Sequence, residues 1–242
     1  MARFRTVIFD CDSTLTSLEG IDLLASAIGP ERKAEVEELT DAAMRGVVAL
    51  EEVYAQRMAL VRPSRADLDA LGQRYIESLV DDARETVAAL RAEGVDVRVV
   101  SGGMLPAILI LTRHLGLPDE VVAAVDVYFD DDGEYADFDA GSPLAYAGGK
   151  RVAIERWLPE LERPIAMVGD GMTDLEAQPV VDAFIAFAGV VERPTVVGAA
   201  DIVVRAPSLA PILPLALDGE PPRDPTAQSV FEKGMRMAPQ EQ

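Results

Sequence analysis

The chain is 242 residues long, enough for one or two domains whose core needs no disulfide or metal to hold it. Apolar residues make up 49% and charged residues 26%, the composition of a globular protein and not of a disordered chain. The formal net charge of −20 argues against nucleic acid and membrane surfaces as partners, and an anionic ligand would need positive charge at its own site.

The numbers of cysteine and histidine residues exclude one kind of cross-link and one kind of metal site. A single cysteine and a single histidine exclude an intrachain disulfide and a zinc site made of these two residue types. The first ten residues lack the apolar core of a signal peptide, and the longest uncharged stretch, residues 99–112, is interrupted by glycine and proline. We therefore expect a cytoplasmic protein.

Short apolar runs of mainly aliphatic and β-branched residues recur along the chain, at residues 6–9, 95–100, 165–168, 183–187 and 201–204. Runs without polar alternation are typical of strands that helices cover on both faces. Between them, residues 105–115 and 150–158 carry apolar side chains at helical spacing. This alternation predicts an α/β fold with a doubly wound parallel sheet.

The segment over residues 17–84 interrupts the alternation, because it shows only helical periodicity, with Pro30 and Pro63 at predicted helix starts. A helical block directly after the first strand predicts an inserted subdomain. We accordingly expect an α/β core over residues 1–16 and 85–217 and a helical cap over 17–84. The polar, proline-rich residues 218–242 are expected to form a loose C-terminal tail.

The acidic segment at residues 126–139 has two interpretations. A calcium loop with Gly133 at its sixth position would place Tyr128 where the first carboxylate ligand is needed. Two short strands joined by Asp132-Gly133 agree better with the chemistry, because this dipeptide suits a tight turn. We expect the hairpin.

Polar side chains follow three of the predicted strands. Asp10 and Asp12 follow the first, Ser101 follows the run at 95–100, and Asp170 follows the run at 165–168. These ends share one edge of a parallel sheet, where α/β proteins bind ligands. Converging carboxylates repel one another unless a cation lies between them, and Mg²⁺ suits a site with few protein oxygens. The sequence therefore predicts a magnesium site.

An anion-binding site is predicted at the same edge. Ser101 precedes Gly102 and Gly103, which let backbone N–H groups approach an anion closely. Lys150, at the start of a predicted helix, can supply a point charge. Metal, lysine and helix N-termini would offset the acidic surface locally, so the predicted ligand is a phosphate group.

Each motif is common by itself: Asp-x-Asp often forms a cap or turn, and Ser-Gly-Gly or Gly-Asp-Gly often joins a strand to a helix. Their order along one chain is far less common and resembles that of haloacid-dehalogenase-type phosphatases, in particular the phosphoserine phosphatases. The resemblance extends from about residue 6 to 217 and rests on Asp10-Cys11-Asp12-Ser13-Thr14-Leu15, Glu19-Gly20-Ile21-Asp22, Arg57, Ser101-Gly102-Gly103, Lys150 and Gly169-Asp170-Gly171-Met172-Thr173-Asp174.

The resemblance implies a Rossmann-like core with an inserted helical cap, and it assigns roles at the strand ends. Asp10 would be the nucleophile that forms an aspartyl-phosphate, and Asp12 the general acid and then the general base. The Mg²⁺ ligands would be Asp10, the backbone carbonyl of Asp12, and Asp170. Asp174 would help to order the surroundings of the metal.

The resemblance also implies how the substrate is held. The phosphoryl group would contact Ser101, the Gly102 amide and Lys150. On sequence alone, solvated helix charges are the favoured interpretation of Glu19 and Arg57 over ligands, but the resemblance makes them the partners of the substrate's ammonium and carboxylate groups. Further substrate-pocket positions are Met44, Gly103 and Thr173.

The implied reaction is magnesium-dependent hydrolysis of O-phospho-L-serine to L-serine and phosphate, the last step of serine biosynthesis. Three alternatives stay open: the same chemistry on another small ester such as phosphohomoserine or a sugar phosphate, phosphotransfer to an alcohol, and a non-catalytic phosphate-binding scaffold. The expected partner is the small phosphate ester. A homodimer is the oligomeric state considered.

Overall fold

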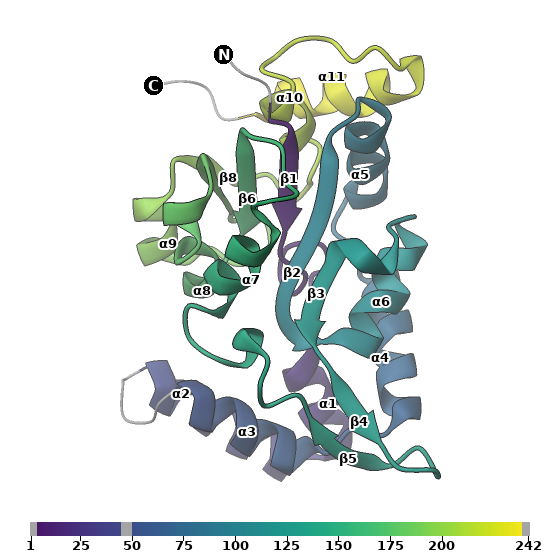
Figure 1. Ribbon diagram of the computed structural model, residues 1–242, viewed down its shortest axis with the longest axis vertical. Helices are drawn as coiled ribbons and strands as arrows, with labels where there is room; N and C mark the ends of the chain where they lie inside the picture. The colour runs from purple at the N-terminus through teal and green to yellow at the C-terminus, as the bar shows by residue number, and fades with distance from the viewer. Residues whose placement is uncertain (1–3, 45–49, 239–242) are drawn as a thin grey trace.

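The computed structural model describes residues 4–44 and 50–238. At its centre lies a six-stranded parallel sheet with the strand order β3-β2-β1-β6-β7-β8 (Figure 1). The strands are β1 (Thr6–Phe9), β2 (Asp96–Met104), β3 (Val122–Val125), β6 (Ile165–Gly169), β7 (Ala183–Phe187) and β8 (Ile202–Val204). The apolar runs predicted all of these strands except β3.

Helices cover both faces of the sheet, as predicted for a doubly wound fold. Val7 and Phe9 of β1 enter one hydrophobic cluster and Ile8 between them enters another, because strand neighbours point to opposite faces. The first cluster packs under α5 (Ala83–Ala92), α6 (Leu105–His114) and α10 (Ile212–Ala216). The second packs under α7 (Gly149–Trp157), α8 (Met172–Leu175) and α9 (Pro194–Ala199). Short 3₁₀ turns link these elements: η1 (Asp119–Val121), η2 (Pro143–Ala145) and η3 (Gln178–Val180).

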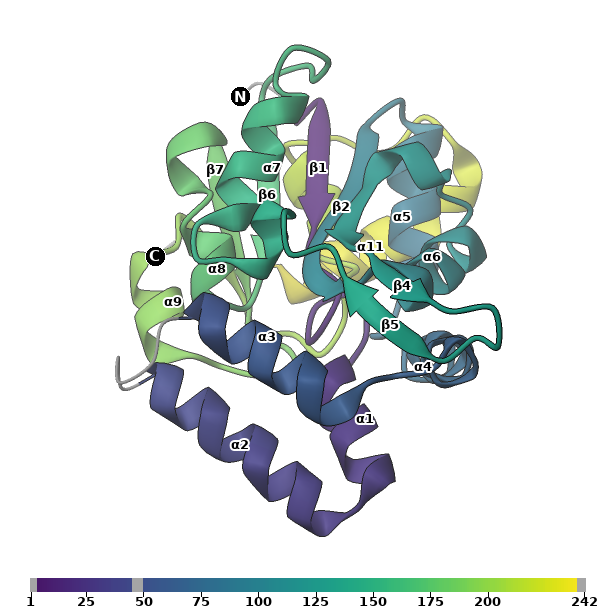
Figure 2. The same ribbon diagram turned by 60° about the horizontal axis from the view of Figure 1, so that its bottom comes forward.

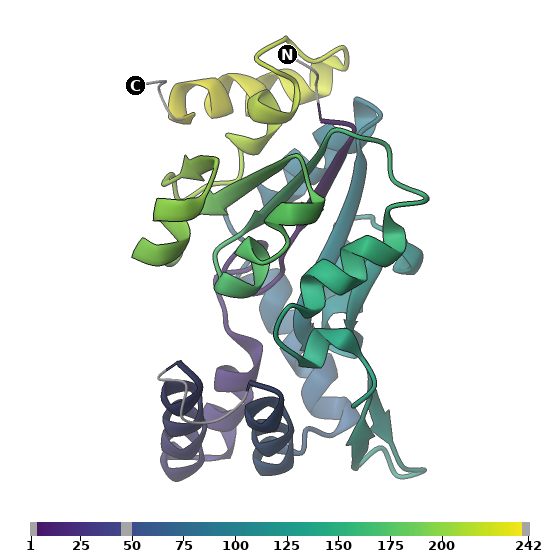
Figure 3. The same cartoon turned by 60° about the vertical axis from the view of Figure 1, so that its left-hand side comes forward.

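A group of helices lies beyond the carboxyl end of the sheet (Figures 1 and 3): α1 (Gly20–Ile28), α2 (Pro30–Met44), α3 (Leu50–Val61) and α4 (Arg65–Glu77). They fall within the segment 17–84 predicted as the cap. Helix α4 begins after Pro63 because Ser64 and Asp67 cap each other's backbone N–H groups at 2.9 and 3.2 Å. It packs so closely on α6 that a Cβ at Gly72 would lie 2.7 Å from Ile110.

The acidic segment forms the predicted hairpin, with β4 (Val127–Phe129) antiparallel to β5 (Tyr135–Phe138). Figure 2 shows the hairpin reaching the cap beside α3 and α4. The guanidinium of Arg65 lies 4.6 Å from the ring centre of Phe129, and Arg62 donates a hydrogen bond of 3.1 Å to the carbonyl of Tyr135. The hairpin therefore braces the cap against the core.

The expected loose tail after Leu217 is corrected by the structure. The 3₁₀ turn η4 (Pro225–Ala227) leads into α11 (Gln228–Met237), which packs on α5 and α10. Phe231 is only 5% exposed, and the ammonium of Lys233 lies 2.6 Å from Asp82 at the start of α5. The amphipathic spacing of α11 anchors it despite the prolines before it. None of the described helices is long and apolar enough to span a bilayer.

Candidate active site

Strand register brings the predicted site residues to one edge of the sheet. Phe9 at the end of β1 pairs with Val99 of β2 and with Val168 of β6. The residues just beyond these positions therefore start from neighbouring points of the sheet edge. Asp10 continues the register, because its backbone N–H donates a 2.9 Å hydrogen bond to the carbonyl of Val168.

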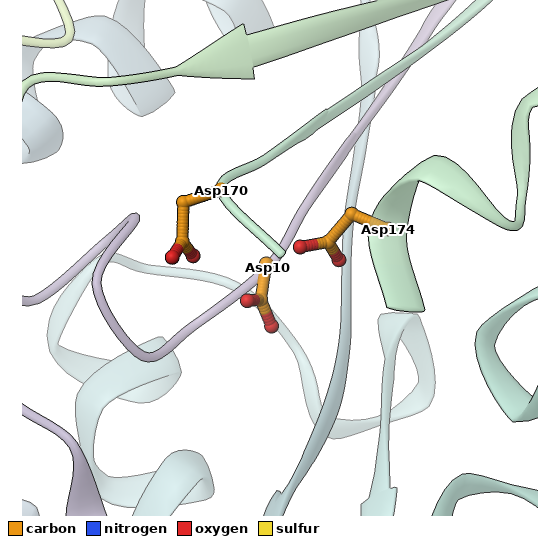
Figure 4. A group of neighbouring side chains, drawn as sticks. All are labelled: Asp10, Asp170 and Asp174. Carbon is orange, nitrogen blue, oxygen red and sulfur yellow. The ribbon is translucent and has the colours of Figure 1, made fainter. Parts of the chain in front are cut away.

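Three buried carboxylates meet at this edge (Figure 4). Asp10 follows β1, Asp170 follows β6, and Asp174 lies on α8; carboxylate oxygens of all three lie within 4.8 Å of one another. Burial is the main cause that raises the pKa of Asp10, and it raises the pKa of Asp170 to about 6. Neighbouring carboxylates add to both shifts. Negative charge is thus concentrated where little water can screen it.

Lys150 supplies positive charge to this cluster. Its ammonium lies 2.6 Å from one oxygen of Asp10 and 2.6 Å from one oxygen of Asp174. Both contacts raise the pKa of Lys150, although burial acts against them, so the lysine is charged at neutral pH. It enters the site from the first turn of α7.

The loop after β6 holds Asp174 in place. Its second oxygen accepts a 2.9 Å hydrogen bond from the backbone N–H of Gly171. Asp174 also packs against Gly169, where an added Cβ would lie 2.2 Å from its carboxylate carbon. Only glycine leaves room at this position. The sequence analysis predicts that Asp174 only helps to order the surroundings of the metal. The structure places Asp174 inside the acidic cluster itself.

Asp12 points away from the cluster, toward the cap. One of its oxygens accepts a 3.0 Å hydrogen bond from the backbone N–H of Gly20, while the other is buried without a hydrogen bond from the described residues. Burial raises the pKa of Asp12. Its side chain does not join the group of three carboxylates, so a metal contact through its backbone carbonyl stays a prediction.

The predicted phosphate-binding residues surround a cavity of about 220 Å³. Ser101, Gly102 and Gly103 lie in the last part of β2, where the register with β3 shifts, and not in a strand-to-helix turn. The Ser101 hydroxyl accepts a 3.0 Å hydrogen bond from the N–H of Gly103. These residues line the cavity together with Asp10 and Lys150.

The cap supplies the opposite wall. Glu19 and Arg57 both line the cavity, as the resemblance implies, and so does Thr173 from α8. The Nε of Arg57 is buried and has no hydrogen-bond partner among the described residues. Burial raises the pKa of Glu19 to about 7, helped by the charge of Asp12. The side chain of Met44 lies outside the described part of the chain.

The sequence analysis did not identify Arg193 and Tyr54. Arg193 follows β7, and its guanidinium lies 2.7 Å from Asp170 and 3.6 Å from Glu19. Applying the strand-end argument to β7 would have pointed to this region. Tyr54 lines the cavity one helical turn before Arg57, a spacing that places both on one face of α3. Other newly found cavity residues are Ile21, Met58, Met104 and Leu144.

The acidic cluster fits a hard divalent cation. Its donors are carboxylate oxygens, the type of ligand that Mg²⁺ prefers. One oxygen of Asp170 lies 2.7 Å from a guanidinium nitrogen of Arg193, an ion pair without hydrogen-bond geometry. A cation bound by Asp170 would share this carboxylate with Arg193.

Comparisons with known proteins agree with this arrangement. A family model described as haloacid dehalogenase-like hydrolase matches residues 4–178. The phosphoserine phosphatase of Mus musculus is 41% identical over 189 residues, covering 77% of this chain and 83% of its own. The Homo sapiens protein of the same name is 39% identical over 188 residues, with the same coverage.

Solved structures give the same result. A phosphoserine phosphohydrolase-like protein from Francisella tularensis matches with a TM-score of 0.75 and 25% identity over 84% of this chain and 95% of its own. A phospho-aspartyl intermediate analogue of phosphoserine phosphatase matches with a TM-score of 0.71 and 26% identity over 88% and 98%. The chain therefore belongs to the haloacid dehalogenase-like hydrolases, and within them to the family of the phosphoserine phosphatases.

Proposed function

We propose that this chain is a magnesium-dependent phosphomonoesterase that hydrolyses O-phospho-L-serine to L-serine and phosphate. One observation carries the proposal: a single cavity has Asp10 and Lys150 at its core wall and Glu19 and Arg57 at its cap wall. The core wall suits a phosphoryl group. The cap wall suits the charged amino-acid end of the same molecule.

Asp10 is the proposed nucleophile. Its carboxylate oxygen attacks phosphorus and forms an aspartyl-phosphate while the bond from phosphorus to the seryl oxygen breaks. Lys150, held beside Asp10, orients the carboxylate and attracts the phosphoryl oxygens. Mg²⁺, bound by the Asp10 and Asp170 carboxylates and by the Asp12 carbonyl, would neutralise charge on the phosphoryl group. Ser101 and the Gly102 amide hold the same group.

Asp12 is the proposed acid and base. Burial raises its pKa, the direction that a general acid needs, and its protonated form would give a proton to the departing seryl oxygen. The resulting carboxylate then takes a proton from the water that attacks the aspartyl-phosphate, which releases phosphate and regenerates Asp10. The hydrogen bond from Gly20 orients Asp12, and Gly20 belongs to the first turn of the cap.

Substrate choice is assigned to the cap. The unpaired Nε of Arg57 can donate to the substrate carboxylate, which a guanidinium binds with two parallel hydrogen bonds. Glu19 can accept from the ammonium group. Gly103, Thr173 and Met44 complete the proposed pocket. We place this reaction in serine biosynthesis in the cytoplasm.

The test measures phosphate release from O-phospho-L-serine and from p-nitrophenyl phosphate, with Mg²⁺ and with chelator. We expect fast release that depends on Mg²⁺ and strongly prefers phosphoserine. Asp10→Asn should abolish turnover on both esters while circular dichroism shows an intact fold.

The other outcomes separate the alternatives. Release from the aryl ester alone would keep the chemistry and reject phosphoserine as the substrate. Release from neither ester, with Mg²⁺ bound, would identify a phosphate-binding scaffold. Appearance of a phosphorylated alcohol in place of free phosphate would identify a phosphotransferase.

A further inference from the structure

Tyr54 has a position in the cavity that the proposed reaction does not yet use. It lies on α3 and lines the cavity together with Arg57 and Met58, three and four residues further along the helix. Residues at this spacing lie on one helical face. A phenol therefore stands beside the guanidinium that faces the substrate.

The ring of Tyr54 is held from two sides. It packs against Phe138 of β5 with ring centres 5.3 Å apart and a tilt of 54°, and it contacts both hydrophobic clusters of the core. The hairpin that carries Phe138 also contacts the cap through Arg62 and Arg65, so the ring packs against a surface that is held on both sides. A tyrosine has only two side-chain torsions, so a fixed ring also fixes its oxygen.

The hydroxyl group of Tyr54 is a hydrogen-bond donor on a residue that lines the cavity. None of the hydrogen bonds found among the described residues involves it. Burial raises the pKa of Tyr54, Arg57 lowers it, and Asp12 raises it, which places the phenol within electrostatic reach of both residues. The phenol keeps its proton at neutral pH and can donate it to an anionic ligand atom.

We propose that the Tyr54 hydroxyl is a second hydrogen-bond donor to the substrate carboxylate, beside Arg57, and that Tyr54 is a specificity-determining residue. This assignment rests on the proposed function, because it requires a substrate that carries a carboxylate. A neutral donor next to a cation suits a carboxylate, which offers several acceptor sites. The Nε of Arg57 has no hydrogen-bond partner among the described residues.

The test is Tyr54→Phe, assayed on O-phospho-L-serine and on O-phosphoethanolamine, which lacks only the carboxylate. Removing one hydrogen bond to a charged group should lower kcat/KM for phosphoserine about tenfold to a hundredfold, mostly through KM. The value for phosphoethanolamine should stay within about twofold. Tyr128→Phe is the matched control, because Tyr128 is 47% exposed on β4 and does not line the cavity.

A second measurement compares Tyr54→Phe, Arg57→Ala and the double variant on phosphoserine. If both residues hold the same carboxylate, the loss in the double variant should be smaller than the product of the single losses. Losses that multiply would place the Tyr54 contact elsewhere on the substrate and overturn the proposal.

The remaining outcomes are equally decisive. An equal fall on both substrates, or no fall on either, would overturn the role of Tyr54 and leave the proposed function standing. If the wild-type enzyme hydrolysed phosphoethanolamine and phosphoserine with equal kcat/KM, that result would overturn the proposed function. It would overturn the carboxylate contact too. Loss on phosphoserine alone supports the assignment.

Discussion

The protonation of single residues in this site depends on nearby charges. Because these residues are buried, water screens the charges poorly. Lys150 is shared between Asp10 and Asp174, and Arg193 is the cation nearest to Asp170. Two cations thus face three acidic groups, which leaves a negative centre that attracts a metal ion or a proton. Burial is the main cause of the raised pKa values of Asp10 and Asp170, and the neighbouring carboxylates add to it. The chemistry of the site therefore depends on what compensates this charge.

Glu19 should make substrate binding depend on pH. Its side chain is 43% exposed, yet burial of the carboxylate and the charge of Asp12 raise its pKa to about 7. Since only the ionised form attracts an ammonium group, KM for phosphoserine should fall as pH rises through about 7. Glu19→Gln should remove this step, and the wild-type to variant ratio of KM across pH cancels the titration of the substrate itself. Parallel profiles for the two proteins would contradict the assignment.

At the scale of elements, continuous apolar runs were sufficient to predict the buried strands. β1 and β7 match their predicted bounds because their residues are apolar throughout or nearly so and lie under helices on both faces. The two edge strands differ: β8 was predicted because its Ile-Val-Val sequence is entirely β-branched, whereas β3 was missed because two alanines occupy the middle of its Val-Ala-Ala-Val sequence. Residue patterns therefore identify an edge strand only when its own residues favour a strand.

The site shows the same division. Motif residues after β1, β2 and β6 could be predicted because each follows a recognisable strand. Arg193 and Tyr54 could not, since their roles arise from tertiary contacts with Asp170 and Phe138 and not from a local pattern. The docking of α11 was hidden for a related reason: the preceding prolines indicate a loop, while its buried face becomes visible only once α5 and α10 are in place.

Helix α11 should contribute measurably to stability. Phe231 is 5% exposed and packs in the main hydrophobic cluster, so Phe231→Ala should lower the free energy of unfolding by about 3 kcal/mol through lost burial and a cavity. Met235, 49% exposed on the same helix, provides the control, and Met235→Ala should change stability by less than about 0.5 kcal/mol. Urea denaturation followed by circular dichroism measures both. Equal small effects would mean that α11 does not dock in solution.

For the molecule as a whole, the acidic site and the net charge of −20 act in the same direction. Groups such as Asp170 and Glu19 have pKa values of about 6 and 7 in the folded protein, above their ordinary values of 3.8 and 4.5. The folded state therefore binds more protons than the unfolded state between roughly pH 4 and 7, so the free energy of unfolding falls as pH rises through this window. Self-repulsion of the acidic surface adds to the fall.

Without divalent metal, the protein should thus be less stable at about pH 8 than at about pH 5, by roughly 2 kcal/mol or more. Mg²⁺ at a hundred times its Kd should restore about 2.7 kcal/mol at the higher pH, because it binds the ionised carboxylates of the folded state. Urea denaturation in chelator and in MgCl₂ measures this, with NaCl of matched ionic strength to separate general screening from site binding. Asp170→Asn should reduce both the pH dependence and the Mg²⁺ response, because it removes a buried acid that must otherwise ionise without a bound cation. If NaCl stabilised as much as MgCl₂, the cation would act on the surface charge and not on the buried carboxylates.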